Sequence, residues 1–365
     1  MNKVNHSENG DIIYFDNAEQ AHAYAKANPG VVVKRIENKF CVFSTYTNSG
    51  SSKITPSKIF EHLDQHVISQ GVAKREIAQT LYYHYVKSQN YEASIFGQNL
   101  PLMLVGSTGS GKTFITQKAC EVVDLIFLHV NAANMVPDGI KGYSVDSIGA
   151  ELLELYGGDT KKLNHAVIFF DEIDKLFMSD STDSQFGSRV AAQILRILEG
   201  GDLKVYVNSD NLTIKTNNML FILGGAFQPI IDEKSVQKST MGFVDNDKKE
   251  KNIMITLEDL YAYGVPKELL GRVGGVLNLS KLEKEDYFNI LIKSKSTPLS
   301  EFIAKIQYHG NFVDIDMDTL EKIAQKAAQS DLGARGLRQI LKSLFQDALF
   351  DAPSNSGKMY KIRYE

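Results

Sequence analysis

The sequence is poor in cysteine: it contains only Cys41 and Cys120, which stand far apart and form no CxxC pair. We therefore expect neither a structural zinc site nor a disulfide framework, and a reducing compartment fits best. No apolar run approaches the roughly 20 residues of a membrane-spanning helix. The first residues, MNKVNHSENGD, are polar and lack the apolar core of a signal peptide. These absences predict a soluble, cytoplasmic protein without zinc and without a membrane partner.

An excess of charge of either sign is also missing. The chain carries 40 Lys and Arg against 44 Asp and Glu, a net charge of −4 over 365 residues. Nothing in this balance calls for a nucleic-acid or anionic-membrane partner. The length suggests about two or three domains, and a hydrophobic content of 43% is ordinary for globular proteins.

A phosphate-binding pattern stands near the middle of the first half. Residues 106–113 read GSTGSGKT, a complete GxxxxGK[ST] motif between an apolar run, Leu102–Val105, and a helix-compatible stretch, Phe114–Val123. In a strand–loop–helix context, backbone N–H groups of such a loop close around phosphate oxygens. A glycine-rich turn without a ligand is the alternative, but both flanks favour a nucleoside triphosphate site. The predicted ATP-binding residues here are Gly106, Ser107, Thr108, Gly109, Ser110, Gly111, Lys112 and Thr113.

Two carboxylates follow a later apolar strand, Val167–Phe170. Asp171 is placed to hold a Mg²⁺ ion together with the Thr113 hydroxyl, while Lys112 reaches the β- and γ-phosphates. Glu172, one residue further, can polarise the attacking water as a general base. The sequence therefore predicts Mg²⁺-dependent ATP hydrolysis.

The hydrophobic pattern divides the chain into three segments. Residues 1–52 alternate strand-like runs (Asp11–Phe15, Val31–Ile36, Lys39–Thr45) with one helix, Ala18–Ala27, and end in a Ser- and Gly-rich linker. This predicts a small α+β module. Residues 53–280 alternate apolar strands with helices, and residues 281–365 are mainly helical. The five strands expected in the middle segment are Leu102–Val105, Leu125–Val130, Val167–Phe170, Met219–Leu223 and Val276–Leu279. Such strands predict an α/β fold with a parallel sheet covered on both faces.

Five segments in order resemble the AAA+ superfamily, and within it the ClpX-type protein unfoldases, over about residues 60–355. They are Leu63–Gln70, Phe170–Lys175, Gly224–Phe227, Glu268–Arg272 and Leu332–Arg338. The resemblance implies a P-loop NTPase core, a helical lid domain at the C-terminal end, and adenine contacts from Val67 and Ile68. Ser69 replaces the glycine usual in that segment. No polar residue is assigned at the tip of the strand near Leu223.

The resemblance also implies roles for two arginines. Arg272 matches the arginine finger, which completes the site of a neighbouring subunit and therefore requires a ring, here a homohexamer. Arg335 matches the lid arginine that senses the γ-phosphate and converts its loss into lid movement. From the residues alone, the alternative for Arg272 is a solvated surface arginine, and the alternative for Arg335 is a capping or surface-paired arginine. Arg338 competes with Arg335 for the same role.

Three further loops resemble parts of the ClpX-type machinery. Gly142, Tyr143, Ser144 and Val145 resemble the aromatic pore loop that grips unfolded polypeptide, although a Tyr packed on its own loop is the alternative. Residues 179–188 match the position of a second pore loop. Met241, Gly242 and Phe243 stand in a polar insertion, residues 228–251, and resemble the loop that docks a ClpP-like peptidase.

Two departures from the family concern substrate choice. The zinc-binding N-terminal module is absent, and residues 204–212 form a short hairpin without Arg or His where the family carries a basic loop. We expect an ATP-dependent unfoldase that threads unfolded or tagged proteins through its ring for a ClpP-like peptidase. The alternative is a stand-alone AAA+ remodeller without a protease partner. A nucleic-acid motor would need a basic channel, whereas the pore loops are acidic to neutral.

Overall fold

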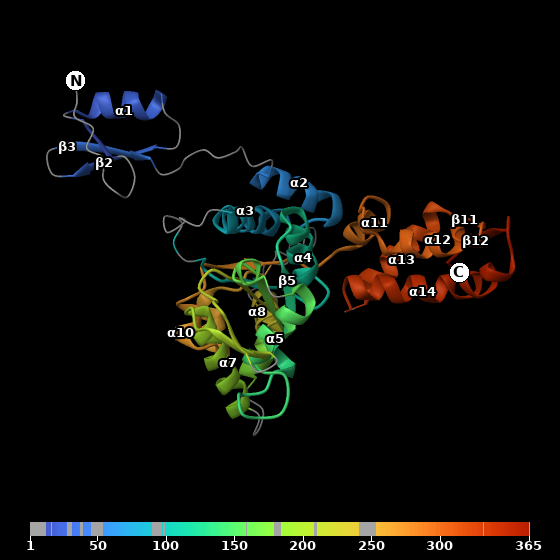
Figure 1. Ribbon diagram of the computed structural model, residues 1–365. Coiled ribbons are helices and arrows are strands. Elements are labelled where there is room, and N and C mark those ends of the chain that lie inside the picture. Colours follow the sequence, from blue (N-terminus) through green and yellow to red (C-terminus); the bar gives the residue numbers. More distant parts are fainter. Residues whose placement is uncertain are drawn as a thin grey trace. The chain divides into compact units, whose positions relative to one another are not determined.

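A computed structural model describes most of the chain (Figure 1). The described residues are 12–15, 17–27, 31–36, 39–44, 54–89, 97, 99–157, 159–178, 184–207, 210–240, 253–330 and 332–364. The chain divides into two compact units, the first comprising residues 1–55 and 92–95 and the second residues 56–91 and 96–365. The three-part division with boundaries at 52 and 280 stays a prediction.

The first unit is a small α+β module. Helix α1 (Ala18–Ala27) accompanies an antiparallel sheet of order β1-β3-β2, built from β1 (Ile12–Phe15), β2 (Val31–Ile36) and β3 (Lys39–Ser44). Phe15 and Ala21 are buried together. Because so short a segment buries little apolar surface, its independent stability is small.

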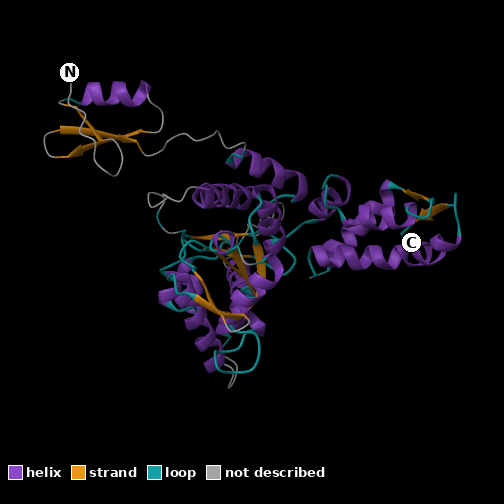
Figure 2. Cartoon of the chain, viewed as in Figure 1, coloured by secondary structure: helices purple, strands orange, loops and turns teal. Residues whose placement is uncertain are grey.

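The second unit is built on a five-stranded parallel sheet, the predicted architecture (Figure 2). Its order is β10-β4-β9-β6-β5, so the two strands that lead into the phosphate loop and the acid pair, β4 and β6, both lie beside β9. The strands are β4 (Leu102–Val105), β5 (Phe127–Asn131), β6 (Val167–Asp171), β9 (Leu220–Gly225) and β10 (Gly275–Asn278). All residues of β4 and β9 are buried, which explains their continuous apolar sequences.

Nine helices accompany this sheet among the described residues, and a hairpin forms a separate two-stranded sheet. They are α2 (Pro56–His66), α3 (Gly71–Gln89), α4 (Lys112–Val123), α5 (Val145–Tyr156), α6 (Thr160–Leu163), α7 (Ser184–Leu198), α8 (Gln228–Thr240), α9 (Leu257–Tyr263) and α10 (Lys267–Leu270). One face of the sheet shares an apolar core with α5 and α7. The predicted hairpin is present as β7 (Leu203–Val207) and β8 (Asp210–Ile214), paired antiparallel. The polar insertion expected from residue 228 begins as helix α8 rather than as a loop.

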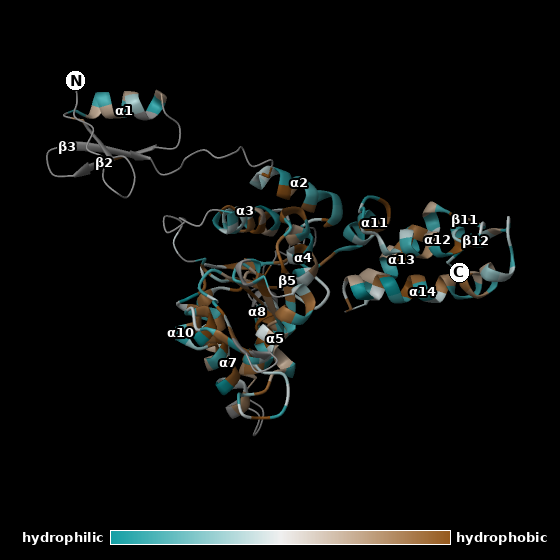
Figure 3. Ribbon diagram, in the orientation of Figure 1, coloured by the Kyte–Doolittle hydropathy of each residue, from teal (hydrophilic) through white to brown (hydrophobic). Residues whose placement is uncertain are grey.

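The C-terminal part of this unit has an apolar core of its own, formed by helices and a two-stranded parallel sheet. Its elements are α11 (Lys284–Ile292), α12 (Pro298–Gln307), β11 (Phe312–Ile315), α13 (Met317–Gln329), α14 (Ala334–Asp351) and β12 (Met359–Ile362). Figure 3 shows apolar and polar residues alternating around α14, whose buried stripe includes Leu337, Leu341 and Phe345. Among the described residues, no helix combines the length and apolar character that crossing a membrane requires.

Candidate active site

The loop at 106–113 leaves β4 and turns directly into α4. Gly106 N–H donates to the Gly225 carbonyl at 3.3 Å, and Ser110 N–H donates to the Ser107 carbonyl at 3.2 Å. Gly109 and Gly111 have φ values of +77° and +99°, which other residues rarely adopt. The backbone therefore forms the curved loop with a helix N-terminus that phosphate binding requires.

Lys112 lies folded across this loop. Its Nζ donates to the Gly106 carbonyl at 2.7 Å and to the Ser107 carbonyl at 3.2 Å. Burial lowers the pKa of the Lys112 ammonium, while the negative charges of Asp171 and Asp174 oppose the shift. A nucleotide would replace these carbonyls with phosphate oxygens, which are stronger partners for a buried cation.

Thr113 and Asp171 lie side by side. The Thr113 hydroxyl donates to Asp171 Oδ2 at 2.9 Å, His129 Nε2 lies 3.3 Å from the same oxygen, and Glu172 N–H donates to Oδ1 at 2.9 Å. Burial raises the pKa of Asp171, but these hydrogen bonds and the Lys112 charge outweigh it, so the pKa lies below its usual value. The group is ionised at neutral pH.

This pair fits a Mg²⁺ ion of the kind shared with a nucleotide. Mg²⁺ takes one or two protein oxygens and completes its shell with phosphates and waters. The described part of the chain contains no group of three or more His, Cys, Asp or Glu side chains that could hold a metal by themselves. A hydroxyl beside a single carboxylate is therefore a suitable site only when the nucleotide supplies the other ligands.

Glu172 follows β6 in a strained conformation, with φ +57°. Asn131, the last residue of β5, lies opposite Asp171 in the sheet and its Nδ2 donates to Glu172 Oε2 at 3.3 Å. Left-handed conformations of non-glycine residues cluster at functional sites, where the surroundings hold them. Sequence reasoning missed Asn131 and His129. Their signal was position in β5, the strand next to β6: Asn131 ends that strand and His129 lies two residues before it.

Asp174 connects the acid pair to the end of β9. The side chain is buried and accepts hydrogen bonds from Ala226 N–H at 3.2 Å and Phe227 N–H at 3.3 Å. No polar residue had been assigned at this strand end. A carboxylate from the short 3₁₀ helix that follows β6, Ile173–Phe177, therefore makes the polar contact there.

The N-terminus of α14 meets the phosphate loop. Ala334 N–H donates to the Gly109 carbonyl at 3.2 Å, and a Cβ on Gly333 would lie 2.6 Å from the Gly109 Cα. Arg335, the second residue of α14, is close enough for its charge to lower the pKa of Lys112. Arg338 instead forms an ion pair with Glu301 of α12. Of the two competing arginines, Arg335 is the one near the loop.

The segment expected to contact adenine lies between α2 and α3. Val67 is buried and Ile68 partly buried. Gln70 Nε2 donates to the Ser280 carbonyl at 2.8 Å and its Oε1 accepts from Ser280 N–H at 2.9 Å. The amide group thus ties this segment to the start of the helical part, and the adenine contacts stay a prediction.

The structure does not bring Arg272 to the phosphate loop. Its guanidinium pairs with Glu199, just beyond α7, at 2.6 Å, and both side chains are about half exposed. An exposed cation away from the loop of its own chain is what a finger acting on a neighbour requires, so this role stays a prediction.

The loop residues expected to contact substrate and peptidase are only partly described. Gly142, Tyr143 and Ser144 lie between β5 and α5, and Val145 is the first residue of α5. Tyr143 is half-buried and its hydroxyl is bonded to Glu151. Met241, Gly242 and Phe243 lie outside the described residues, as do residues 179–183 of the second predicted pore loop.

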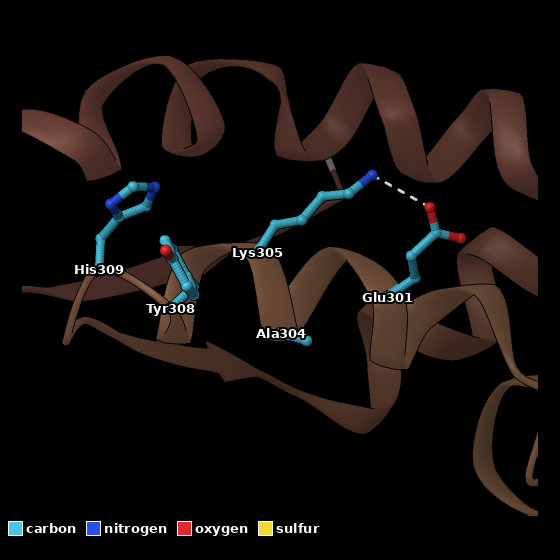
Figure 4. Close-up of a pocket in the computed structure, with 5 residues that line it drawn as sticks. All are labelled: Glu301, Ala304, Lys305, Tyr308 and His309. Atoms are coloured by element: carbon cyan, nitrogen blue, oxygen red, sulfur yellow. Dashed lines mark hydrogen bonds and ion pairs between the residues drawn. The ribbon is translucent and has the colours of Figure 1, made fainter.

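An open pocket on the helical part contains none of the predicted site residues (Figure 4). It is lined by Glu301, Ala304, Lys305, Tyr308 and His309. Lys305 pairs with Glu301 at 3.0 Å, one turn apart on α12. This pocket is separate from the candidate active site.

Known proteins resemble this chain over the region that contains the candidate site. The AAA domain (Cdc48 subfamily) model matches residues 98–276, which contain the phosphate loop and the acid pair. The chain is 33% identical over 326 residues to the ATP-dependent Clp protease ATP-binding subunit ClpX of Treponema denticola, covering 83% of this chain and 79% of that protein.

Proteins of the same name from other bacteria match similarly. The Borrelia duttonii protein is 30% identical, with 82% of this chain and 75% of the relative covered. The Bacteroides thetaiotaomicron protein is also 30% identical, with 84% and 79% covered. The chain therefore belongs to the ClpX family, and it is an AAA ATPase.

Proposed function

We propose that this chain is one subunit of a homohexameric ring that uses Mg²⁺-ATP to unfold proteins and pass them to a ClpP-like peptidase. The proposal is supported most directly by the meeting of Thr113, Asp171 and Glu172 beside the phosphate loop. The names of the relatives, ATP-binding subunits of an ATP-dependent Clp protease, support the peptidase partner.

Each side chain of the site has a defined task in this proposal. Lys112 leaves the carbonyls of the loop and binds the β- and γ-phosphates. Thr113 and Asp171 hold Mg²⁺, which neutralises phosphate charge when bound. Glu172 takes a proton from the attacking water, and Asn131 orients its carboxylate from the neighbouring strand.

Lid movement would follow from the loss of the γ-phosphate. Arg335 stands on α14, whose first residues rest on Gly109 of the phosphate loop. When the γ-phosphate is lost, Arg335 loses the negative charge that it contacts. The position of α14, which carries Arg335, then changes. The helical part would transmit this movement to the ring.

Assembly into a ring is supported by exposed groups on the surface. Arg272 is about half exposed and is paired with Glu199 rather than with the phosphate loop of its own chain. On the helical part, the paired residues Phe312 and Met359 are 54% and 53% exposed, and nearby Tyr308 is 86% exposed. Exposed apolar groups gathered in this way are typical of protein interfaces.

Replacing Glu172 tests the catalytic assignment. We expect Glu172→Gln to bind ATP with unchanged affinity while lowering the hydrolysis rate by roughly 100-fold or more, because loss of a general base costs that much. Nucleotide binding and phosphate release are measured on the same preparation. Hydrolysis at the wild-type rate would exclude Glu172 as the base.

Met241 and Phe243 separate the proposed function from the alternative of a stand-alone remodeller. With a ClpP-like peptidase present, we expect the double change Met241→Ala and Phe243→Ala to abolish degradation of a protein substrate and leave ATP hydrolysis unchanged. Unaltered degradation would disprove the docking role. Wild-type unfolding that no ClpP-like peptidase converts into degradation would favour the remodeller.

A further inference from the structure

His129 is a polar residue in the middle of the apolar strand β5. Its neighbours Leu128 and Val130 are buried in the large apolar core, whereas the His129 side chain is 44% exposed. Successive side chains of a strand point to opposite faces of the sheet, so His129 lies on the face away from that core. Its role therefore has to come from the contacts on its own face.

Two contacts on that face hold the imidazole. His129 is in register with Phe169 of β6, and the two rings stack with centroids 5.9 Å apart and planes 24° apart. Phe169 is fully buried, so the ring that supports His129 is itself fixed. His129 Nε2 lies 3.3 Å from Oδ2 of Asp171, two residues further along β6. The imidazole is thus directed at the acid pair.

The carboxylate of Asp171 is held at both of its oxygens. The Thr113 hydroxyl donates to Oδ2 from α4, His129 approaches the same oxygen from β5, and the Glu172 N–H donates to Oδ1. Burial raises the pKa of Asp171, and the His129 hydrogen bond is the largest of the contacts that lower it. Thr113 is itself a proposed Mg²⁺ ligand, and Glu172 contributes only its backbone. Of the side chains bonded to Asp171 in the described part of the chain, His129 is therefore the one that can hold the carboxylate without binding the ion.

We propose that His129 is a positioning residue of the metal site, which fixes the Asp171 carboxylate for Mg²⁺ by donating its Nε2–H to Oδ2. An ionised carboxylate only accepts hydrogen bonds, so the proton of this bond is on Nε2. A carboxylate that is already held does not have to be ordered when the ion binds, and loss of such an outer partner lowers metal affinity about 10- to 100-fold. This inference rests on the proposed function, in which Thr113 and Asp171 hold the ion.

The test separates binding of the nucleotide from binding of the metal. Full-length protein is titrated with a fluorescent, non-hydrolysable ATP analogue, once with saturating Mg²⁺ and once with excess EDTA. The ratio of the two affinities measures the coupling between nucleotide and ion. His129→Phe retains a ring to stack on Phe169 and lacks the donor. We expect it to lower that ratio by about tenfold or more and to leave the affinity in EDTA unchanged.

Two further variants identify the hydrogen bond as the cause. The amide N–H of a glutamine extends from the backbone about as far as the Nε2–H of a histidine, so His129→Gln should recover most of the ratio. His309→Phe is the same change in the pocket of the helical part, which is separate from the candidate active site. It is the matched control and should behave as wild type.

A wild-type ratio in His129→Phe would overturn the positioning role and leave the nucleotide site in place. The role is also excluded by an equal loss of affinity with and without Mg²⁺, or by a ratio in His129→Gln as low as that in His129→Phe. If His129→Phe does not fold, His129→Met, which also lacks the donor, takes its place. If Mg²⁺ does not raise the affinity of the wild-type protein for the analogue, the proposed function itself fails and this inference fails with it.

Discussion

His84 is completely buried in α3 and has a partner on each ring nitrogen. Nε2 lies 2.8 Å from the His165 carbonyl, and Nδ1 lies 2.8 Å from the Asn99 amide nitrogen. The carbonyl can only accept, so Nε2 carries the proton and Nδ1 accepts from the amide. Burial lowers the pKa of His84 to about 3. The hydrogen bond to the His165 carbonyl opposes this shift, whereas the nearby side chains of His165 and Lys87 add to it.

This residue predicts acid sensitivity. Below pH 6.5 the unfolded chain binds a proton at this position while the folded chain stays neutral until about pH 3. The unfolded state therefore holds more protons, and stability falls as the pH is lowered. One proton accounts for about 2 kcal/mol between pH 6.5 and 5. Denaturant unfolding at both pH values should show this loss in wild type and a smaller one in His84→Gln.

Two neighbouring groups also contribute to the pH dependence of stability, and one exposed histidine serves as a control. The pKa values of His165 and Lys87 are also lowered by burial, so His165 will retain part of the slope in the variant. His22→Gln, an exposed position in the N-terminal unit, should leave the slope as in wild type. An identical slope in His84→Gln and wild type would contradict the prediction.

At the scale of elements, the turn between α2 and α3 is strained and bonded to the helical part. Ser69 and Gln70 both have a φ of +58°, which is costly for residues with a Cβ. Ser69 donates to Asp286 of α11, Lys295 N–H donates to the Gln65 carbonyl at 2.8 Å, and the Gln70 amide pairs with the Ser280 backbone. These bonds stabilise a conformation that the chain alone disfavours.

Two substitutions of Ser69 separate strain from bonding. Ser69→Ala removes the hydroxyl but not the strain, and we expect it to cost about 1 kcal/mol and raise the KM for ATP, because this turn positions Val67 and Ile68. Ser69→Gly loses the same bond but relieves a strain of about 1 kcal/mol, so it should lie close to wild type in stability. Thermal unfolding and ATPase kinetics check both. Equal stability of the Ala and Gly variants would disprove the strain argument.

At the scale of the whole molecule, the proposed arginine finger would make hydrolysis a property of the proposed ring. Arg272→Ala and Lys112→Ala rings should each lose most ATPase activity, since a finger contributes roughly 1,000-fold or more. In a one-to-one mixture, a productive interface needs an intact Lys112 next to an intact Arg272 from the other variant. Half times half leaves about a quarter of the interfaces active, so the mixture should recover up to that fraction.

The ion pair of Arg272 provides the control for this experiment. Glu199→Ala removes the partner but leaves the guanidinium, and we expect it to retain ATPase activity. Full activity of Arg272→Ala rings, or no recovery in mixtures that assemble, would exclude a finger that acts on the neighbouring subunit.

Much of the architecture and part of the site follow from contiguous sequence. The phosphate loop is eight consecutive residues between a buried strand and a helix, so its glycines and Lys112 were identifiable without a structure. The five apolar runs likewise predicted the parallel sheet, with ends shifted by one or two residues where Asn131 and Gly225 extend their strands.

The sequence by itself determined the chemistry that local residues can carry: phosphate binding by the loop, and a pair of carboxylates at the end of a strand. Only the tertiary structure decided which distant side chains join them. Asn131 and His129 reach the acid pair because β5 lies next to β6, and Gly333 meets Gly109 because α14 begins on the loop. The physical reason is that strand order and helix docking result from packing the whole core, which no short segment specifies.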